Sequence, residues 1–195
     1  MMISAKVAIV PGGSSGTGRA AALALARQGA KFLITGRRPQ SRKETAALHK
    51  DIIGFFADVA VPGNAGALLP LRDATAERIN TIFAVNVVGP SLLTAAALPH
   101  LEATKGPIVN ISSTFGHKPG ADLSHYAASK AALEHLTRCW ALELAPEGLR
   151  DNAVAAGPTE SSALTGHYGP LSGTCRGDRG GGTRTATAQA PRNSG

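Results

Sequence analysis

The chain has 195 residues, which suits one domain with a hydrophobic core of its own. Its formal charge of +7 comes in part from four arginines against one aspartate after residue 170, and no aromatic residues lie among the other clustered basic residues to stack on bases, which disfavours nucleic acid as a partner. The two cysteines form no CxxC pair, the six histidines show no ligand spacing and no apolar run approaches a membrane-spanning length, so we expect a cytoplasmic protein with free thiols and neither a metal nor a membrane partner.

A glycine-rich loop lies between an expected strand at residues 6–10 and an expected helix at residues 19–28. Glycines let backbone N–H groups approach a pyrophosphate, and the helix N-terminus adds positive potential. Most glycine-rich loops are ordinary turns, but the order of strand, loop and helix favours phosphate binding here. The candidate phosphate-binding residues are Gly12, Ser14, Ser15, Gly16, Thr17 and Gly18.

A second strand is expected at residues 31–35, followed by Gly36, Arg37 and Arg38. In dinucleotide-binding folds the end of this strand meets the adenosine ribose, where an acidic residue accepts the 2′-hydroxyl and an arginine accommodates a 2′-phosphate. This chain has two arginines there and no acidic residue. The sequence therefore favours NADP(H) over NAD(H), with a solvated basic turn as the alternative.

Further strands and helices alternate along the chain. We expect helices at residues 41–50, at 74–101 with a break at 89–90, and at 124–144, and strands at residues 51–59, 106–111 and 150–155. This alternation predicts an α/β fold, a Rossmann-like doubly wound parallel sheet in a single domain over residues 1–168. Residues 169–195 contain almost no large apolar side chain, and we expect a disordered, basic, glycine-rich tail.

Tyr126 and Lys130 are four residues apart in the expected helix 124–144, so they lie on one helical face. An ammonium one turn away favours the phenolate and should lower the pKa of the tyrosine toward the working pH. Ser113 precedes this pair by a loop, and its hydroxyl could hold a substrate oxygen against the phenol. This pattern is typical of acid/base chemistry at a carbonyl or an alcohol, although an exposed Tyr and Lys pair is common on helices.

With these motifs in order, the chain resembles the classical short-chain dehydrogenase/reductase family over about residues 5–165. The loop at 12–18 is similar to the family's cofactor loop, and Asp58 to the residue that contacts adenine. The other positions that match family motifs are Asn64, Ala65 and Gly66 beside the cofactor, Asn86, Ser113, Tyr126 and Lys130 as the catalytic tetrad, and Gly157 and Thr159 at the nicotinamide end.

The resemblance implies a reversible reaction between NADP(H) and a small-molecule carbonyl or alcohol substrate. In this family's scheme Tyr126 would exchange the proton, and Lys130 would lower the pKa of Tyr126 and hold the nicotinamide ribose. Ser113 would position the substrate oxygen, and Asn86 would hold a water of the proton relay. The resemblance also implies a homodimer or homotetramer.

The interval between Asp58 and Asn64 is too short for the helix and strand that the family places there, because parallel neighbours need a crossover of a dozen or more residues. One segment, residues 52–61, must therefore stand for either the third or the fourth strand. Losing a central strand would leave ladder groups unpaired in the interior, whereas losing an edge strand would not. We therefore expect residues 52–61 in the centre of a sheet with fewer strands, which would take Asp58 away from adenine.

Two further departures from the family concern the C-terminal part. Asp151 lies in the last expected strand, where a buried carboxylate without a partner is costly, and no family pattern continues beyond Thr159. These departures leave a second hypothesis open, namely a catalytically silent remnant or a cofactor-binding regulator. A third hypothesis, nucleic-acid binding by the basic tail, has less support because the tail shows no recognisable fold.

Overall fold

The computed structural model describes residues 6–56 and 68–157. The strands, helices and short helical turns of these two ranges alternate in the expected order. They are β1 (Val7–Val10), α1 (Gly16–Ala26), β2 (Lys31–Gly36), α2 (Pro39–Ala47), β3 (Ile52–Phe56), the 3-10 turn η1 (Leu71–Asp73), α3 (Ala76–Phe83), the π-helical turn η2 (Ala84–Val88), α4 (Gly89–Thr104), β4 (Ile108–Ser113), the 3-10 turn η3 (Thr114–Gly116), α5 (Ser124–Leu144) and β5 (Asp151–Ala156). The expected tail at 169–195 lies outside the described residues.

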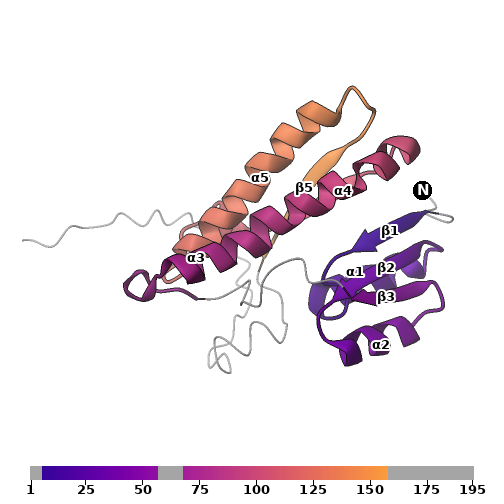
Figure 1. Cartoon of the computed structure of the whole chain (residues 1–195), viewed down its shortest axis with the longest axis horizontal. Coiled ribbons are helices and arrows are strands. Elements are labelled where there is room, and N and C mark those ends of the chain that lie inside the picture. The colour runs from indigo at the N-terminus through magenta and orange to yellow at the C-terminus, as the bar shows by residue number, and fades with distance from the viewer. Residues whose placement is uncertain (1–5, 57–67, 158–195) are drawn as a thin grey trace, which may run out of the picture.

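The strands form two parallel sheets, one ordered β1-β2-β3 and the other β4-β5. Figure 1 shows the first sheet with α1 and α2, and the second with α5 and the long helix α3–α4. In the first sheet Phe32 of β2 lies opposite Ile52 of β3, so β3 is an outer strand. The prediction that residues 52–61 take the central position is therefore wrong for the part that is described. β3 follows β2 through the short crossover helix α2 and pairs directly with it, which places β3 at the edge of the sheet. In the described ranges no strand lies between β1 and β4.

The first sheet has one covered face and one open face. Side chains of α1 and α2 pack on the face that carries Phe32, Ile34 and Ile52, which are buried together with Ala22 and Ala26. Successive strand residues point to opposite faces, so their neighbours along the strands point away from α1 and α2. Val7 is 76% exposed, Ile53 66% and Phe55 60%. Large apolar side chains are therefore exposed on the face of the first sheet that lies opposite α1 and α2.

The long helix runs without interruption from α3 through η2 into α4, so the expected break at residues 89–90 is wrong. Pro90 has no N–H to donate to the Asn86 carbonyl, four residues earlier. The backbone adjusts by widening one turn, and the Gly89 N–H donates to the Ala84 carbonyl in the π-helical pattern. The helix therefore continues past Pro90, and Asn86 lies in the π-helical turn.

The same helical run, Ala76–Thr104, has 29 residues and a mean hydropathy of 1.7 in its most apolar window, so by length and composition it could cross a membrane. The expectation that no segment approaches this length is therefore wrong. Length and composition do not distinguish a membrane span from a helix of a folded domain. Here α3 and η2 pack against α5.

Asp151, the first residue of β5, is buried and has hydrogen-bond partners. The Asn110 side-chain amide donates to Asp151 Oδ1 over 3.2 Å and to Thr137 Oγ1 over 3.0 Å. Burial raises the pKa of Asp151 to about 6, and a hydrogen bond from the Asn152 backbone acts in the opposite direction. The concern that this carboxylate lacks a partner is therefore wrong, although its burial still disfavours the charged form.

Candidate active site

The glycine loop has the backbone geometry of a phosphate cradle. Gly12 and Gly16 have φ values of 69° and 52°, in the left-handed region that favours glycine. A Cβ at Gly12 would meet nothing within 4 Å, whereas one at Gly18 would lie 2.7 Å from the Gly12 carbonyl oxygen. The loop therefore packs tightly against the start of α1 at Gly18, whereas the space beside Gly12 is free of other described atoms. Ser15, the N-cap residue of α1, makes no side-chain capping bond, so its hydroxyl does not occupy the first N–H groups of the helix.

Side chains from α1 and α2 hold the loop through one carbonyl. The Ser14 carbonyl accepts a hydrogen bond from Arg19 Nη2 over 2.8 Å and another from Thr45 Oγ1 over 3.2 Å. Arg19 also lies 3.7 Å from the Glu44 carboxylate, and its Nε is buried without a hydrogen-bond partner among the described residues. The sequence alone gave no signal for Arg19 or Thr45, because their contact with the loop depends on how α2 packs.

Arg37 and Arg38 follow β2 directly and are exposed. In the described part of the chain neither guanidinium makes a hydrogen bond or an ion pair, so both can reach a ligand in solvent. Gly36 cannot be replaced without strain, because a Cβ there would meet Ser14 Oγ. The ends of β1 and β2 therefore bring the glycine loop and the two predicted arginines together.

Tyr126 and Lys130 lie one turn apart on α5, as predicted. Lys130 Nζ is 5.8 Å from the centroid of the Tyr126 ring and donates a hydrogen bond to the Ile111 carbonyl over 2.8 Å. Burial lowers the pKa of Lys130 from its ordinary value. The phenol has no hydrogen-bond partner among the described residues. The hydrogen bond to the Ile111 carbonyl fixes the Lys130 side chain between β4 and the Tyr126 ring.

Asn86 is buried and reaches the same helix from η2. Its Nδ2 donates to Ser129 Oγ over 3.1 Å, and Ser129 Oγ donates to the Tyr126 carbonyl over 2.7 Å. This contact links residues 43 positions apart in the sequence. Ser129 was not predicted, because serine on a helix carries no signal of such a distant partner.

Ser113 ends β4 and is buried, and its Oγ accepts a hydrogen bond from the Phe115 N–H over 3.3 Å. The loop that follows is anchored to α5 through Glu134. The Glu134 carboxylate accepts a hydrogen bond from Ser112 Oγ over 2.5 Å and lies 2.9 Å from His117 Nε2. No hydrogen bond joins Ser113 to Tyr126 within the described ranges. The structure therefore places Ser113 on the strand that α5 covers, while its proposed contact with substrate stays a prediction.

The other predicted site residues are not all described. Gly157 directly follows β5, and a Cβ there would meet nothing within 4 Å. The remaining predicted residues, Asp58, Asn64, Ala65, Gly66 and Thr159, lie outside the described residues. A cavity of about 230 Å³ lies between α5 and β5 and is lined by Glu134, Arg138 and Asp151 among others. Ser113, Tyr126 and Lys130 do not line this cavity, so we do not assign it to the candidate active site.

The sequence model of the family described as short chain dehydrogenase matches residues 6–69 and 60–169 of this chain. An uncharacterized oxidoreductase of Mycobacterium tuberculosis is 35% identical over 188 residues, which cover 82% of this chain and 71% of that protein. The two overlapping matched segments agree with a chain that keeps both halves of the family pattern and lacks sequence between them.

Solved structures give the same result for the fold. A protein described as a short chain dehydrogenase/reductase family protein is 34% identical with a TM-score of 0.79, covering 87% of this chain and 81% of that one. A putative NAD(P)-dependent gluconate 5-dehydrogenase from Beutenbergia cavernae, solved with bound NADP, is 27% identical with a TM-score of 0.76, covering 84% of this chain and 76% of that one. Neither half of this chain could account for 87% alone, so both sheets superpose together on one Rossmann-like domain.

Proposed function

The chain belongs to the short-chain dehydrogenase family, and we propose that it transfers hydride reversibly between NADP(H) and a small carbonyl or alcohol substrate. The observation that carries the proposal is that one chain contains two groups of residues, each suited to one part of this reaction. An open glycine cradle lies at the start of α1, and a phenol with a fixed ammonium one turn away lies on α5. The first suits a dinucleotide, and the second suits proton exchange with a substrate oxygen.

The residues of the first sheet fit a dinucleotide. A pyrophosphate would lie on the outward side of the glycine loop, where a Cβ at Gly12 would meet nothing within 4 Å, and the uncapped N–H groups of α1 would stabilise it. Arg37 and Arg38 would hold the adenosine 2′-phosphate, because both are exposed and no acidic residue adjoins them in the sequence to accept a ribose 2′-hydroxyl. The preference for NADP over NAD is part of the proposal and rests on these two arginines; the NADP bound to the gluconate 5-dehydrogenase relative supports a nicotinamide cofactor.

The residues of the second sheet supply the proton chemistry. When bound, the nicotinamide supplies or accepts the hydride. The Tyr126 phenol donates its proton to the carbonyl oxygen during reduction and takes it back during oxidation. Lys130 stabilises the phenolate by its charge and is held in place by the Ile111 carbonyl. Ser113 positions the substrate oxygen, and Asn86 fixes the turn of η2 against α5 through Ser129.

A second candidate function is cofactor binding without turnover. The observation that favours it is the separation of β1 from β4, because no described strand joins the sheet that carries the cradle to the sheet that carries the phenol. Hydride transfer needs the reacting atoms within about 3–3.5 Å of each other, and small displacements reduce the rate strongly. A loosely joined domain could therefore keep the nucleotide site and lose the reaction.

We also propose a homo-oligomer and a cytoplasmic location, as expected from the sequence and the resemblance. Leu92 and Val88 on the long helix and Leu142 on α5 are large apolar side chains with exposed surface. Exposed apolar side chains of this size suit contact with a second subunit. The oligomeric state would be measured by light scattering of the purified chain.

Two measurements on the purified chain separate the candidates. The first is thermal melting with NADPH and with NADH, since a ligand present at about 100 times its Kd adds about 2.7 kcal/mol to the stability of the native state. The second is oxidation of NADPH with a panel of ketones and aldehydes. Binding with turnover supports the oxidoreductase, binding without turnover supports the second candidate, and no shift with either nucleotide contradicts both.

A further inference from the structure

Arg42 of α2 makes two hydrogen bonds to the segment that carries Arg37 and Arg38. Its Nη1 donates to the Gly36 carbonyl over 2.6 Å and to the Arg37 carbonyl over 3.0 Å. Both acceptors are backbone groups at the end of β2, where the proposed nucleotide site begins. We propose that Arg42 is a positioning residue that fixes this segment and so determines the preference for a 2′-phosphorylated nucleotide. This inference rests on the proposed function for the existence of the nucleotide site.

The side chain of Arg42 lies against the end of β2 and the middle of β3. A Cβ built at Gly36 would lie 3.6 Å from Arg42 Cγ, and one built at Gly54 would lie 3.4 Å from Arg42 Cβ. The aliphatic stem therefore rests on two glycines of neighbouring strands. Ser14 lies on the same side of Gly36 as Arg42, because its Oγ occupies the space that a Cβ at Gly36 would need. The end of β2 therefore contacts both Ser14 of the glycine loop and Arg42 of α2.

Arg42 has different surroundings from Arg37 and Arg38, and this difference indicates different roles. The Arg42 guanidinium is partly buried and bonded to backbone carbonyls, whereas Arg37 and Arg38 are exposed and, within the ranges that the structure describes, unbonded. A phosphate is bound best by guanidinium groups that are free to donate several hydrogen bonds. Arg37 and Arg38 are therefore suited to contact the 2′-phosphate, and Arg42 to fix the backbone from which they project.

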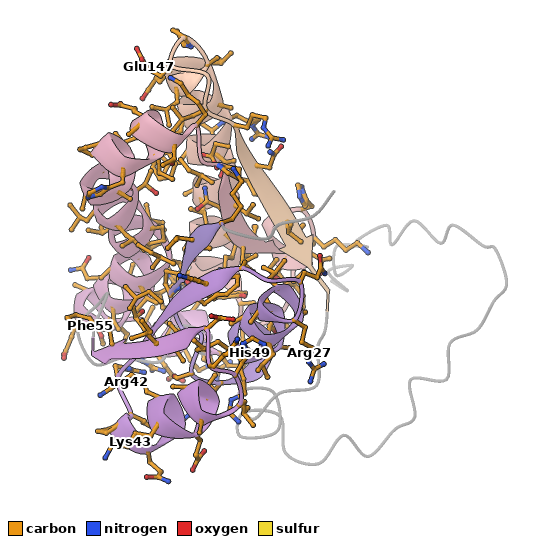
Figure 2. All side chains as sticks on the ribbon, turned by 90° about the vertical axis from the view of Figure 1, so that its right-hand side faces the viewer. Arg27, Arg42, Lys43, His49, Phe55 and Glu147 are labelled. Atoms are coloured by element: carbon orange, nitrogen blue, oxygen red, sulfur yellow. The ribbon has the colours of Figure 1, made fainter. Side chains whose placement is uncertain are left out.

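The test compares two probes that lack nicotinamide, 2′-phospho-ADP-ribose and ADP-ribose, by calorimetric titration of the full chain. We expect the wild type to prefer the phosphorylated probe and Arg42→Gln to reduce that preference about tenfold, which corresponds to about 1.4 kcal/mol. Arg42→Lys should recover part of the preference, because an ammonium can donate to the same carbonyls. Lys43→Gln is the matched control: it removes the same charge from the next residue of α2, which is exposed and points away from the sheet (Figure 2).

Several outcomes would overturn the role of Arg42. Equal weakening of both probes by Arg42→Gln would make Arg42 a structural residue, and an equal loss of preference in Lys43→Gln would make the effect one of general charge. A wild type with no preference for the phosphorylated probe would also overturn it. Melting of each unliganded variant establishes that the fold is retained. Selective binding of the probes without oxidation of NADPH would contradict the proposed reaction and leave the assignment of Arg42 intact.

Discussion

The Asn86 side-chain amide and the Ser129 hydroxyl are joined by a buried hydrogen bond of 3.1 Å that ties the π-helical turn of the long helix to the helix that carries Tyr126 and Lys130. Ser129 in turn donates to the Tyr126 carbonyl. π-helical turns inside α-helices occur frequently at functional sites. Here the turn presents Asn86 to α5 and thereby fixes the backbone that carries the phenol.

This relationship predicts energetic coupling between Asn86 and Ser129. Asn86→Ala and Ser129→Ala should each lower the free energy of unfolding by about 1–3 kcal/mol, because each removes the buried hydrogen bond between the two side chains. The double variant should lose less than the sum, by about 0.5–3 kcal/mol. Chemical denaturation of the four proteins measures this difference. Ser124→Ala, at an exposed position of α5, should add to Asn86→Ala without coupling. Strict additivity for the Asn86 and Ser129 pair would contradict the predicted coupling.

Asp151 predicts a pH dependence of stability with a defined sign. Its pKa is raised to about 6 in the folded chain, from an ordinary value of 3.8, so the folded state binds the proton more tightly than the unfolded state. Stability from this group should therefore be greatest below pH 3.8 and should fall as the pH rises to about 6, above which the loss is complete. The loss should be about 1–3 kcal/mol. Asp151→Asn keeps an acceptor for Asn110 and cannot ionise, so it should be more stable than the wild type at about pH 8 and lack this dependence.

The measurement is urea denaturation at about pH 4 and about pH 8, which lie on either side of the pH range over which the loss is expected. Asp73→Asn is the control, because Asp73 is exposed on η1 and its replacement should leave the difference between the two pH values unchanged. A wild type whose stability rises over this range, with the rise removed in Asp151→Asn, would show that the carboxylate is stabilised by its partners more than burial penalises it.

The open face of the first sheet predicts unequal effects for two phenylalanines. Phe32 is 2% exposed beneath α1 and α2, whereas Phe55 is 60% exposed on the opposite face. Phe32→Ala should lower the free energy of unfolding by about 3–5 kcal/mol, the range for buried phenylalanine. Phe55→Ala should change it by no more than about 0.5 kcal/mol, as for ordinary surface positions. Similar losses for both variants in chemical denaturation would mean that another surface covers Phe55 in solution.

The sequence predicted most elements whose signals are local. The glycine loop lies between β1 and α1 as expected, and the spacing of Tyr126 and Lys130 placed both on α5. The family match supports the resemblance drawn from these motifs. Local signals suffice here because a strand followed by glycines and an apolar helix has few alternative structures.

The errors concern features that depend on distant contacts. The position of β3 was decided by pairing with β2, and the argument from unpaired ladder groups predicted the opposite arrangement. Pro90 was expected to break a helix that instead widened by one residue at η2. The Asn110 amide, 41 residues from Asp151 in the chain, gives that carboxylate the partner it was expected to lack. Which residue meets another across such separations depends on packing that periodicity does not report.

The most direct test of the central claim is the rate of NADPH oxidation by wild type and by Tyr126→Phe with the best carbonyl substrate of the panel. The substitution removes the phenolic hydroxyl group and leaves the ring that lies beside Lys130. We expect the rate to fall by about 10²–10⁴-fold, the contribution typical of general acid catalysis, while NADPH still raises the melting temperature as in the wild type. An unchanged rate in Tyr126→Phe would contradict the assignment of Tyr126 as the proton donor.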